Sequence, residues 1–159
     1  MAADKSTGES VRTFPQRVLI IDDDPLLRAV LRQFFEGHGS VVIDEAEDGQ
    51  DAQNLIEAAS GSYDLTTLDL SMPHVDGFEL LTYLKQNNIE MRILIISSLP
   101  APVIKMAETL ADFKTLNPIG HLRKPVSASA LLSILKSQTW PSHDDPEILQ
   151  QADPRTLCG

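Results

Sequence analysis

Polar side chains that can take part in catalysis or metal binding stand at the ends of apolar runs in this sequence. Consecutive aspartates follow the run VLII, and another aspartate stands inside the apolar segment TLDL. The run RILIIS ends in a serine, and a lysine precedes Pro125. These residues are Asp22, Asp23, Asp24, Asp69, Ser97 and Lys124. The sequence therefore offers an acidic cluster, an isolated carboxylate, a hydroxyl and an ammonium group.

These residue types are suited to holding a divalent cation and to accepting a phosphoryl group. Carboxylates that lie close together repel one another, and a divalent cation relieves that repulsion. Oxygen ligands favour a hard ion such as Mg²⁺, which keeps some of its water. The Asp69 carboxylate can act as a nucleophile and form an aspartyl phosphate. The oxygens of a transferring phosphoryl group need cations and hydrogen-bond donors, which Mg²⁺, Lys124 and Ser97 would supply.

Apolar runs alternate with helical periodicities along the chain and predict the elements that position these side chains. Short runs rich in β-branched residues predict strands buried on both faces, and helix-spaced apolar residues predict amphipathic helices. The predicted strands cover residues 18–21, 41–44, 64–70, 92–97 and 120–122. The predicted helices start at Pro25 and end before the glycines at 37 and 39, cover 51–59, open at 76–77 and reach Leu84, and cover 103–110 and 127–136. This alternation predicts an α/β fold, a doubly wound five-stranded parallel sheet with helices on both faces.

The carboxyl ends of parallel strands meet at one edge of such a sheet, and ligands bind there at the point where the strand order reverses. The polar side chains introduced above follow the predicted strands, so we expect them to converge at this edge. Asp24 is interpreted differently, because Pro25 comes next and the pair is typical of a helix N-cap and a first helical residue.

The composition fits one folded domain with polar ends. The 159 residues are 42% hydrophobic, and 23 acidic residues against 13 basic ones give a formal net charge of −10. A chain this acidic is a poor nucleic-acid binder, because Lys and Arg hold phosphate backbones. Cys158 is the only cysteine, and neither a membrane span nor a signal peptide is evident, so we expect a cytoplasmic protein that does not bind membranes. We interpret residues 1–15 as a flexible leader, 16–138 as the domain and 139–159 as a flexible tail.

Four stretches of the sequence together resemble a known family. VLIIDDDP, LDLSMPHVDG, ILIISS and RKP look like the signature stretches of bacterial response-regulator receiver domains, in the family's order. The resemblance covers about residues 16–137 and suits a stand-alone receiver. It implies a flavodoxin-like sheet with strand order 2-1-3-4-5.

The resemblance implies a phosphoacceptor and a metal site. Asp69 matches the aspartate that accepts the phosphoryl group from a histidine kinase or a histidine phosphotransfer protein. Asp23 matches the direct Mg²⁺ ligand, and Asp22 matches the neighbour that binds the ion through water. Asp69 itself and the backbone carbonyl of Ser71 complete the implied ligands.

The resemblance also implies a switch. Ser97 matches the hydroxyl residue that turns towards the phosphoryl group, and Lys124 matches the lysine that pairs with it. The Lys124–Pro125 bond matches one that is often cis in the family. His121 occupies the position of the switch aromatic, where histidine is less usual and can respond to pH.

A signalling phosphoacceptor of this kind promotes only its own phosphorylation and dephosphorylation and is not otherwise an enzyme. Its output would be a second protein bound at the face around the fourth helix and fifth strand, through which many receivers also form homodimers. Two alternatives stay open. One is a docking module that works without phosphorylation. The other is the receiver part of an EAL-type cyclic-di-GMP phosphodiesterase, because GHLRKPVSASAL resembles receivers joined to such enzymes.

Overall fold

The computed structural model describes residues 11–40, 42–59, 63–112 and 115–141. Its main element is a parallel sheet whose strands lie in the order β3-β2-β4-β5-β6. The strands are β2 (Arg17–Ile21), β3 (Val42–Ala46), β4 (Leu65–Leu68), β5 (Met91–Ser97) and β6 (Leu116–Arg123). Counted among themselves, these five strands have the order 2-1-3-4-5, which confirms the predicted flavodoxin-like topology.

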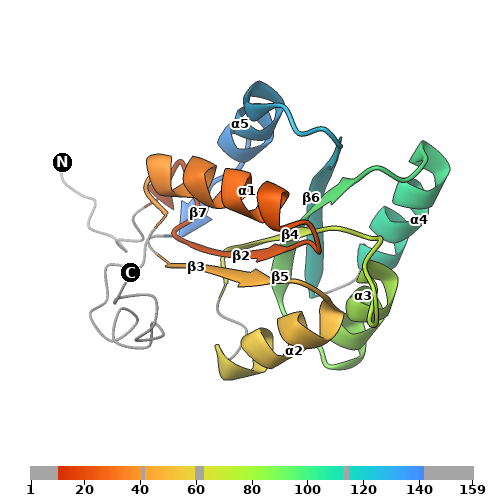
Figure 1. Cartoon of the computed structure of the whole chain (residues 1–159). Coiled ribbons are helices and arrows are strands. Elements are labelled where there is room, and N and C mark those ends of the chain that lie inside the picture. The colour runs from red at the N-terminus through yellow and green to blue at the C-terminus, as the bar shows by residue number, and fades with distance from the viewer. Residues whose placement is uncertain (1–10, 41, 60–62, 113–114, 142–159) are drawn as a thin grey trace.

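Helices cover both faces of the sheet (Figure 1). They are α1 (Pro25–Gly37), α2 (Gly49–Ala58), α3 (Gly77–Gln86), α4 (Ala101–Ala111) and α5 (Ala128–Lys136). One core cluster joins α1 and α5 to the sheet through residues such as Phe35 and Leu131. The other joins α2, α3 and α4 to the opposite face through residues such as Ile56, Leu81 and Ile104. The predicted doubly wound architecture is therefore confirmed.

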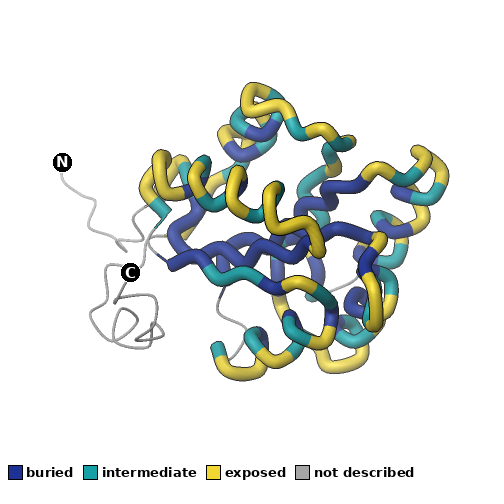
Figure 2. Tube along the Cα trace, in the orientation of Figure 1, coloured by how far each residue is buried: buried dark blue, intermediate teal, exposed yellow. Residues whose placement is uncertain are grey.

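The apolar runs that predicted strands are buried for a geometric reason. Successive strand residues point to opposite faces, and both faces carry helices, so both sets of side chains leave water. Val18, Leu19 and Ile20 are all 0% exposed, and Figure 2 shows the central strands buried along their length. The buried sheet therefore positions the residues that follow the carboxyl ends of its strands.

Side-chain caps determine where most helices begin. Asp24 accepts a hydrogen bond from the amide of Leu26, at 2.9 Å, and Asp76 accepts one from the amide of Glu79. Asp48 and Ser127 cap α2 and α5 in the same way. Such caps satisfy amides that lack a partner in the first helical turn. The predicted N-cap role of Asp24 is confirmed.

The predicted domain boundaries at 15 and 138 need correction. Strand β1 (Val11–Arg12) pairs antiparallel with β7 (Trp140–Pro141) in a small second sheet. Trp140 is 1% exposed and belongs to the core cluster of α1 and α5. The sequence around Trp140 is polar and interrupted by prolines, so it did not predict this contact. One large aromatic side chain is nevertheless enough to bury a short segment. The rest of the predicted leader (1–10) and tail (142–159) lies outside the described residues.

Strand β6 is longer than the predicted 120–122 because it tolerates a proline and a bulge. It lies at the edge of the sheet, where Pro118 costs no ladder hydrogen bond to a further strand. Ile93 and Leu94 of β5 pair with Pro118 and Gly120, so one residue of β6 is unmatched between them.

No helix in the described part of the chain has the length and hydrophobicity of a bilayer span.

We expect Thr67→Val to stabilise the protein by about 1 kcal/mol, because Val removes a buried hydroxyl without changing the shape of the side chain. Thr67 lies in β4 between the apolar residues Ile20 and Leu94, and its Oγ1 has no hydrogen-bond partner among the described residues. Urea unfolding measures the gain. Thr66→Val is the matched control, since the Thr66 hydroxyl donates to the Met91 sulfur and its loss brings no such gain. A clearly destabilised Thr67→Val variant would show that the hydroxyl has a partner in solution.

Candidate functional site

The polar residues singled out from the sequence lie at the carboxyl edge of the sheet. Asp22 directly follows β2, and Asp69 follows β4. Ser97 is the last residue of β5, and Lys124 follows β6. The amide of Lys124 donates to the backbone oxygen of Ser97, at 3.1 Å, so the ends of β5 and β6 are held together. The strand order thus brings residues that are far apart in the sequence to one edge.

Three carboxylates form a cluster at this edge. Oxygen atoms of Asp22, Asp23 and Asp69 all lie within 4.8 Å of one another. Asp22 and Asp69 are buried, and Asp23 is exposed to solvent. The third aspartate of the run, Asp24, is engaged at the start of α1 and does not belong to this group. An oxygen-only set that is open on one side suits a hard cation that keeps part of its water shell.

Lys124 connects the two buried carboxylates. Its Nζ lies 2.9 Å from Oδ2 of Asp22 and 3.3 Å from Oδ2 of Asp69. Burial by itself would lower the pKa of the Lys124 ammonium, but the contacts with Asp22 and Asp69 outweigh burial and raise it. The lysine is therefore charged at neutral pH, and it neutralises only part of the negative charge around it.

The surroundings of Asp69 change the pKa of its carboxyl group. Burial, followed by repulsion from Asp22, raises the pKa of Asp69 to about 6, even though Lys124 and the amide of Ser71 favour the ionised form. The Ser71 amide donates to Oδ1 of Asp69, at 3.2 Å. A carboxylate that is difficult to ionise beside a second buried carboxylate marks a site with room for one more positive charge. The donor set and the electrostatics both fit a divalent cation.

The other predicted site residues occupy the surroundings of this cluster. Ser97 is fully buried, and its Oγ accepts a hydrogen bond from the amide of Leu99, at 3.1 Å, which leaves its hydroxyl proton free to donate. Ser71 contacts Asp69 through its amide, and the predicted role of its carbonyl stays a prediction. The Lys124–Pro125 peptide bond is cis, as the resemblance implied.

His121 is placed by β6 against the fourth helix. Its Nδ1 lies 2.7 Å from Oε1 of Glu108 in α4, and about 43% of its side chain is exposed. The residue that resembles the family's switch aromatic therefore forms a direct polar link between β6 and α4. Its role as a switch stays a prediction.

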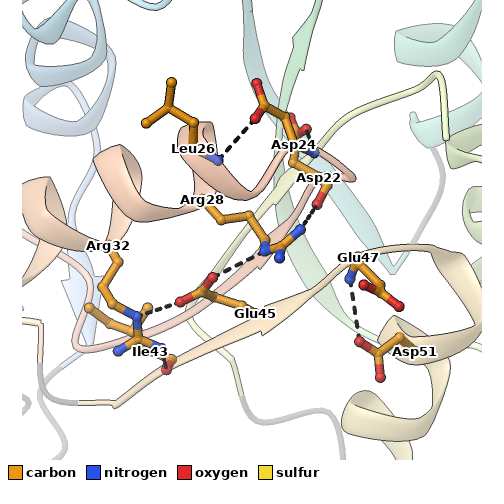
Figure 3. A network of polar contacts seen from close by, with 9 residues as sticks. All are labelled: Asp22, Asp24, Leu26, Arg28, Arg32, Ile43, Glu45, Glu47 and Asp51. Atoms are coloured by element: carbon orange, nitrogen blue, oxygen red, sulfur yellow. Dashed lines mark hydrogen bonds and ion pairs between the residues drawn. The ribbon is translucent and has the colours of Figure 1, made fainter.

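Sequence reasoning missed two features next to the cluster. Arg28 in α1 donates from Nη1 to the backbone oxygen of Asp22, at 2.7 Å, and it also pairs with Glu45 of β3 (Figure 3). The sequence of α1 alone carries no signal for this contact, because the partners belong to other elements. Gly77 lies so close to the loop after β4 that a Cβ atom would stand 2.6 Å from the backbone oxygen of Asp69. A glycine at the first helical position was the only signal for that approach.

The fold and the site together define a flavodoxin-like α/β domain with an acidic cluster and a lysine at its carboxyl edge. The family model described as the response regulator receiver domain matches residues 18–136, and the chain belongs to that family. It is a receiver domain of the kind found in two-component response regulators.

Curated relatives agree with this assignment. The chain is 34% identical to the two-component response regulator ORR41 of Oryza sativa subsp. japonica over 106 residues, which cover 65% of this chain and 84% of that protein. It is 33% identical to the chemotaxis protein CheY of Treponema pallidum over 92 residues, or 58% of this chain and 64% of that protein. A putative transcriptional regulator of Pseudomonas aeruginosa is 35% identical over 81 residues, with 51% of this chain and only 38% of that protein covered. The chain therefore spans less than two thirds of the length of some relatives.

Solved structures show the same fold. A chain of the CheX–CheY–BeF₃–Mg²⁺ complex from Borrelia burgdorferi superposes with a TM-score of 0.67 at 29% identity, covering 78% of this chain and 89% of that chain. A response regulator from Colwellia psychrerythraea superposes with a TM-score of 0.64 at 30% identity, covering 77% of this chain and 94% of that chain.

Proposed function

We propose that this receiver accepts a phosphoryl group on Asp69 from a histidine kinase or a histidine phosphotransfer protein, in a reaction that requires Mg²⁺. The observation that carries the proposal is the buried Asp69 carboxylate with Asp22, Asp23 and Lys124 around it. A charged group in a buried site is costly unless its surroundings are built for it. The cluster supplies a nucleophile and cation-binding groups in one place.

The phosphoryl transfer forms one bond and breaks one, and it uses only a proton from solvent besides the two reacting groups. An oxygen of the Asp69 carboxylate attacks the phosphorus of a phosphohistidine, and a new O–P bond forms. The P–N bond of the donor breaks, its electron pair returns to the imidazole nitrogen, and that nitrogen takes a proton from solvent. Lys124 lies 3.3 Å from Asp69, so its ammonium is close enough to pair with an oxygen of the transferred group.

Asp22, Asp23, Asp69 and the carbonyl of Ser71 are the groups that would hold Mg²⁺. Bound there, the ion would offset the negative charge that gathers on the phosphoryl oxygens during transfer. The raised pKa of Asp69 supports the fit, because burial and, after it, repulsion from Asp22 make this carboxylate hard to ionise, and a bound cation would favour its ionised form.

We further propose that phosphorylation changes the structure of the face formed by α4 and β6. The buried hydroxyl of Ser97 would turn from its contact with Leu99 to donate to the phosphoryl group. This movement would change the end of β5, which leads through residues 98–100 into α4. His121 and Glu108 connect α4 to β6, so they would carry the change to the exposed face.

The output of this cytoplasmic receiver would be the binding of a second protein, or of a second copy of the chain, at the α4–β6 face. Catalysis of any other reaction, nucleic-acid binding and membrane binding are not part of the proposal. The two alternatives raised by the sequence, a phosphorylation-independent docking module and part of an EAL-type phosphodiesterase, stay untested predictions.

The proposal is tested by intact-mass spectrometry after incubation with acetyl phosphate. We expect the wild-type protein to gain one phosphoryl group when Mg²⁺ is present and none in EDTA. Asp69→Asn keeps the shape of the side chain but removes the nucleophile, so it should gain nothing. Asp112→Asn, at an exposed position after α4, is the matched control and should behave like the wild type.

Phosphorylation of Asp69→Asn to the wild-type level would place the acceptor elsewhere and refute the assignment. If the wild type gains nothing from acetyl phosphate, a panel of histidine kinases is the second arm. Failure of both donors would favour the docking-module alternative.

A further inference from the structure

Arg28, in α1, lies outside the acidic cluster and bonds to the backbone that carries two of its aspartates. Its Nη1 donates to the carbonyl oxygen of Asp22, at 2.7 Å, and its Nε donates to Oε1 of Glu45, at 3.1 Å. The Arg28 side chain is only 17% exposed. Figure 3 shows the guanidinium lying between the end of β2 and the neighbouring strand β3. Arg28 therefore spans two elements with two different groups of one planar side chain.

With the bond from Arg28, every polar group of Asp22 has a partner. Its amide donates to the carbonyl of Ala46, at 3.0 Å, and its Oδ1 accepts from the amide of Asp24, at 2.9 Å. Its Oδ2 pairs with Lys124. The carbonyl is the last polar group of this residue, and Arg28 is its partner.

The same carbonyl also determines how Asp23 is presented. A peptide unit is planar, so fixing the oxygen of Asp22 fixes the amide plane that leads into Asp23. The Asp23 carboxylate has no hydrogen bond or ion pair to any other residue in the described part of the chain. It is exposed, and two neighbouring carboxylates repel it. The position of this carboxylate thus depends on its backbone, which Arg28 holds.

We propose that Arg28 is a positioning residue for the metal site, one that orients the Asp22–Asp23 peptide so that both carboxylates face Asp69 before any cation arrives. The proposal rests on the proposed function, which places Mg²⁺ at these carboxylates. Mg²⁺ demands near-ideal octahedral geometry, so a small rotation of one ligand weakens binding. Residues that orient metal ligands from outside the ligand shell contribute strongly to affinity for this reason.

Arg32 provides a matched control within the same network. It also pairs with Glu45, through Nε, and it donates from Nη2 to the carbonyl of Ile43, at 2.7 Å. Arg32 thus joins α1 to β3 as Arg28 does, and it lies one helical turn further along α1 (Figure 3). It contacts the start of β3 instead of the loop that carries Asp22. If the network acts only through stability, substituting either arginine should weaken Mg²⁺ binding. If it orients a ligand, substituting Arg28 alone should weaken binding.

The test compares Arg28→Met, Arg28→Lys and Arg32→Met with the wild type in the full chain. The Mg²⁺ dissociation constant comes from a titration followed in ¹H–¹⁵N NMR spectra, and urea unfolding in EDTA measures stability separately. We expect Arg28→Met to raise the dissociation constant about tenfold, the lower end of the effect of removing an outer-shell partner. Arg32→Met should leave the dissociation constant within about twofold of the wild type, since it touches no ligand backbone.

The metal-free spectra give a second readout. Arg28→Met should shift the amide signal of Asp23 in EDTA, and Arg32→Met should leave that signal in place. Lysine supplies a charge but cannot span the carbonyl of Asp22 and Glu45 together, so Arg28→Lys should recover part of the affinity.

Equal weakening by Arg28→Met and Arg32→Met would overturn the positioning role, because both would then act through general stability. An unchanged dissociation constant in Arg28→Met would overturn it too, while leaving the metal site intact. A wild type that binds no Mg²⁺ would instead refute the metal site itself. If Arg28→Met does not fold, Arg28→Lys decides the question: a weakened site supports the proposal, and wild-type affinity overturns it.

Discussion

Trp140→Ala is expected to lower the free energy of unfolding by about 3 to 5 kcal/mol, the range for removing a large buried aromatic side chain. Trp140 is 1% exposed, and its indole Nε1 donates to the carbonyl of Leu135, at 3.1 Å. Arg92 lies over the ring, with its Cζ 4.8 Å from the centroid. The substitution therefore removes apolar packing, a hydrogen bond and a cation–π contact together.

Urea unfolding followed by far-ultraviolet circular dichroism measures this loss, because Trp140 is the only tryptophan and its fluorescence disappears in the variant. Trp140→Phe is the control. It keeps most of the apolar packing and loses the hydrogen bond, so it should cost only about 1 to 2 kcal/mol. A loss below about 1 kcal/mol in Trp140→Ala would mean that the segment after α5 does not pack on the domain in solution.

Asp69→Asn should make the metal-free protein more stable at pH 7.5, by on the order of 2 kcal/mol, because each unit of pKa shift corresponds to about 1.4 kcal/mol. Burial and the neighbouring Asp22 raise the pKa of Asp69 to about 6. Unfolded, the same group ionises near its ordinary value of about 3.9. Above pH 6 the folded wild type must hold a carboxylate that would ionise more easily in the unfolded chain.

The sign of the pH dependence follows from this difference. A group with a raised pKa in the folded state contributes stability below its unfolded pKa, and that stability is lost as the pH rises through the folded pKa. The advantage of Asp69→Asn should thus be small near pH 4 and full above pH 7. Urea unfolding in EDTA over this range measures it.

Two controls separate the effect of the acidic cluster from the general effect of removing one negative charge. Glu90→Gln removes one negative charge at an exposed position and should show no comparable gain. Millimolar Mg²⁺ should stabilise the wild type more than Asp69→Asn, because the variant lacks one proposed ligand. An Asp69→Asn variant that is less stable than the wild type at pH 7.5 in EDTA would show that the carboxylate is already well compensated.

The parts of the fold that could be predicted from the sequence are those with local causes. Val18 to Ile21 formed a predictable strand because a run buried on both faces is apolar at every position. Asp24 with Pro25 marked a helix start because a cap acts on the residues next to it. The convergence of strand ends then followed from the parallel topology, which explains why Asp22 and Asp69 could be expected together.

The features that were missed depend on partners that are distant in the sequence. Arg28 reads as an ordinary polar position of α1, and its importance comes from a carbonyl at the end of β2 and from Glu45 in β3. His121 could be recognised only by its place in a family pattern, and its partner Glu108 had no sequence signal. Trp140 stood in a segment whose composition is typical of a tail, and composition carries no information about a single side chain that inserts into a core.

The pairing of β1 with β7 makes this domain suited to use as an insertable cassette. Val11 lies opposite Pro141 in that ladder, so the chain enters and leaves the packed unit at adjacent points. Arg12 lies only a few residues before Arg17, where β2 begins, so the shared entry and exit point lies at the amino edge of the sheet, away from the acidic cluster. A host protein could therefore receive the domain in one surface loop without separating the ends of that loop. In such a fusion the acidic cluster would face away from the host.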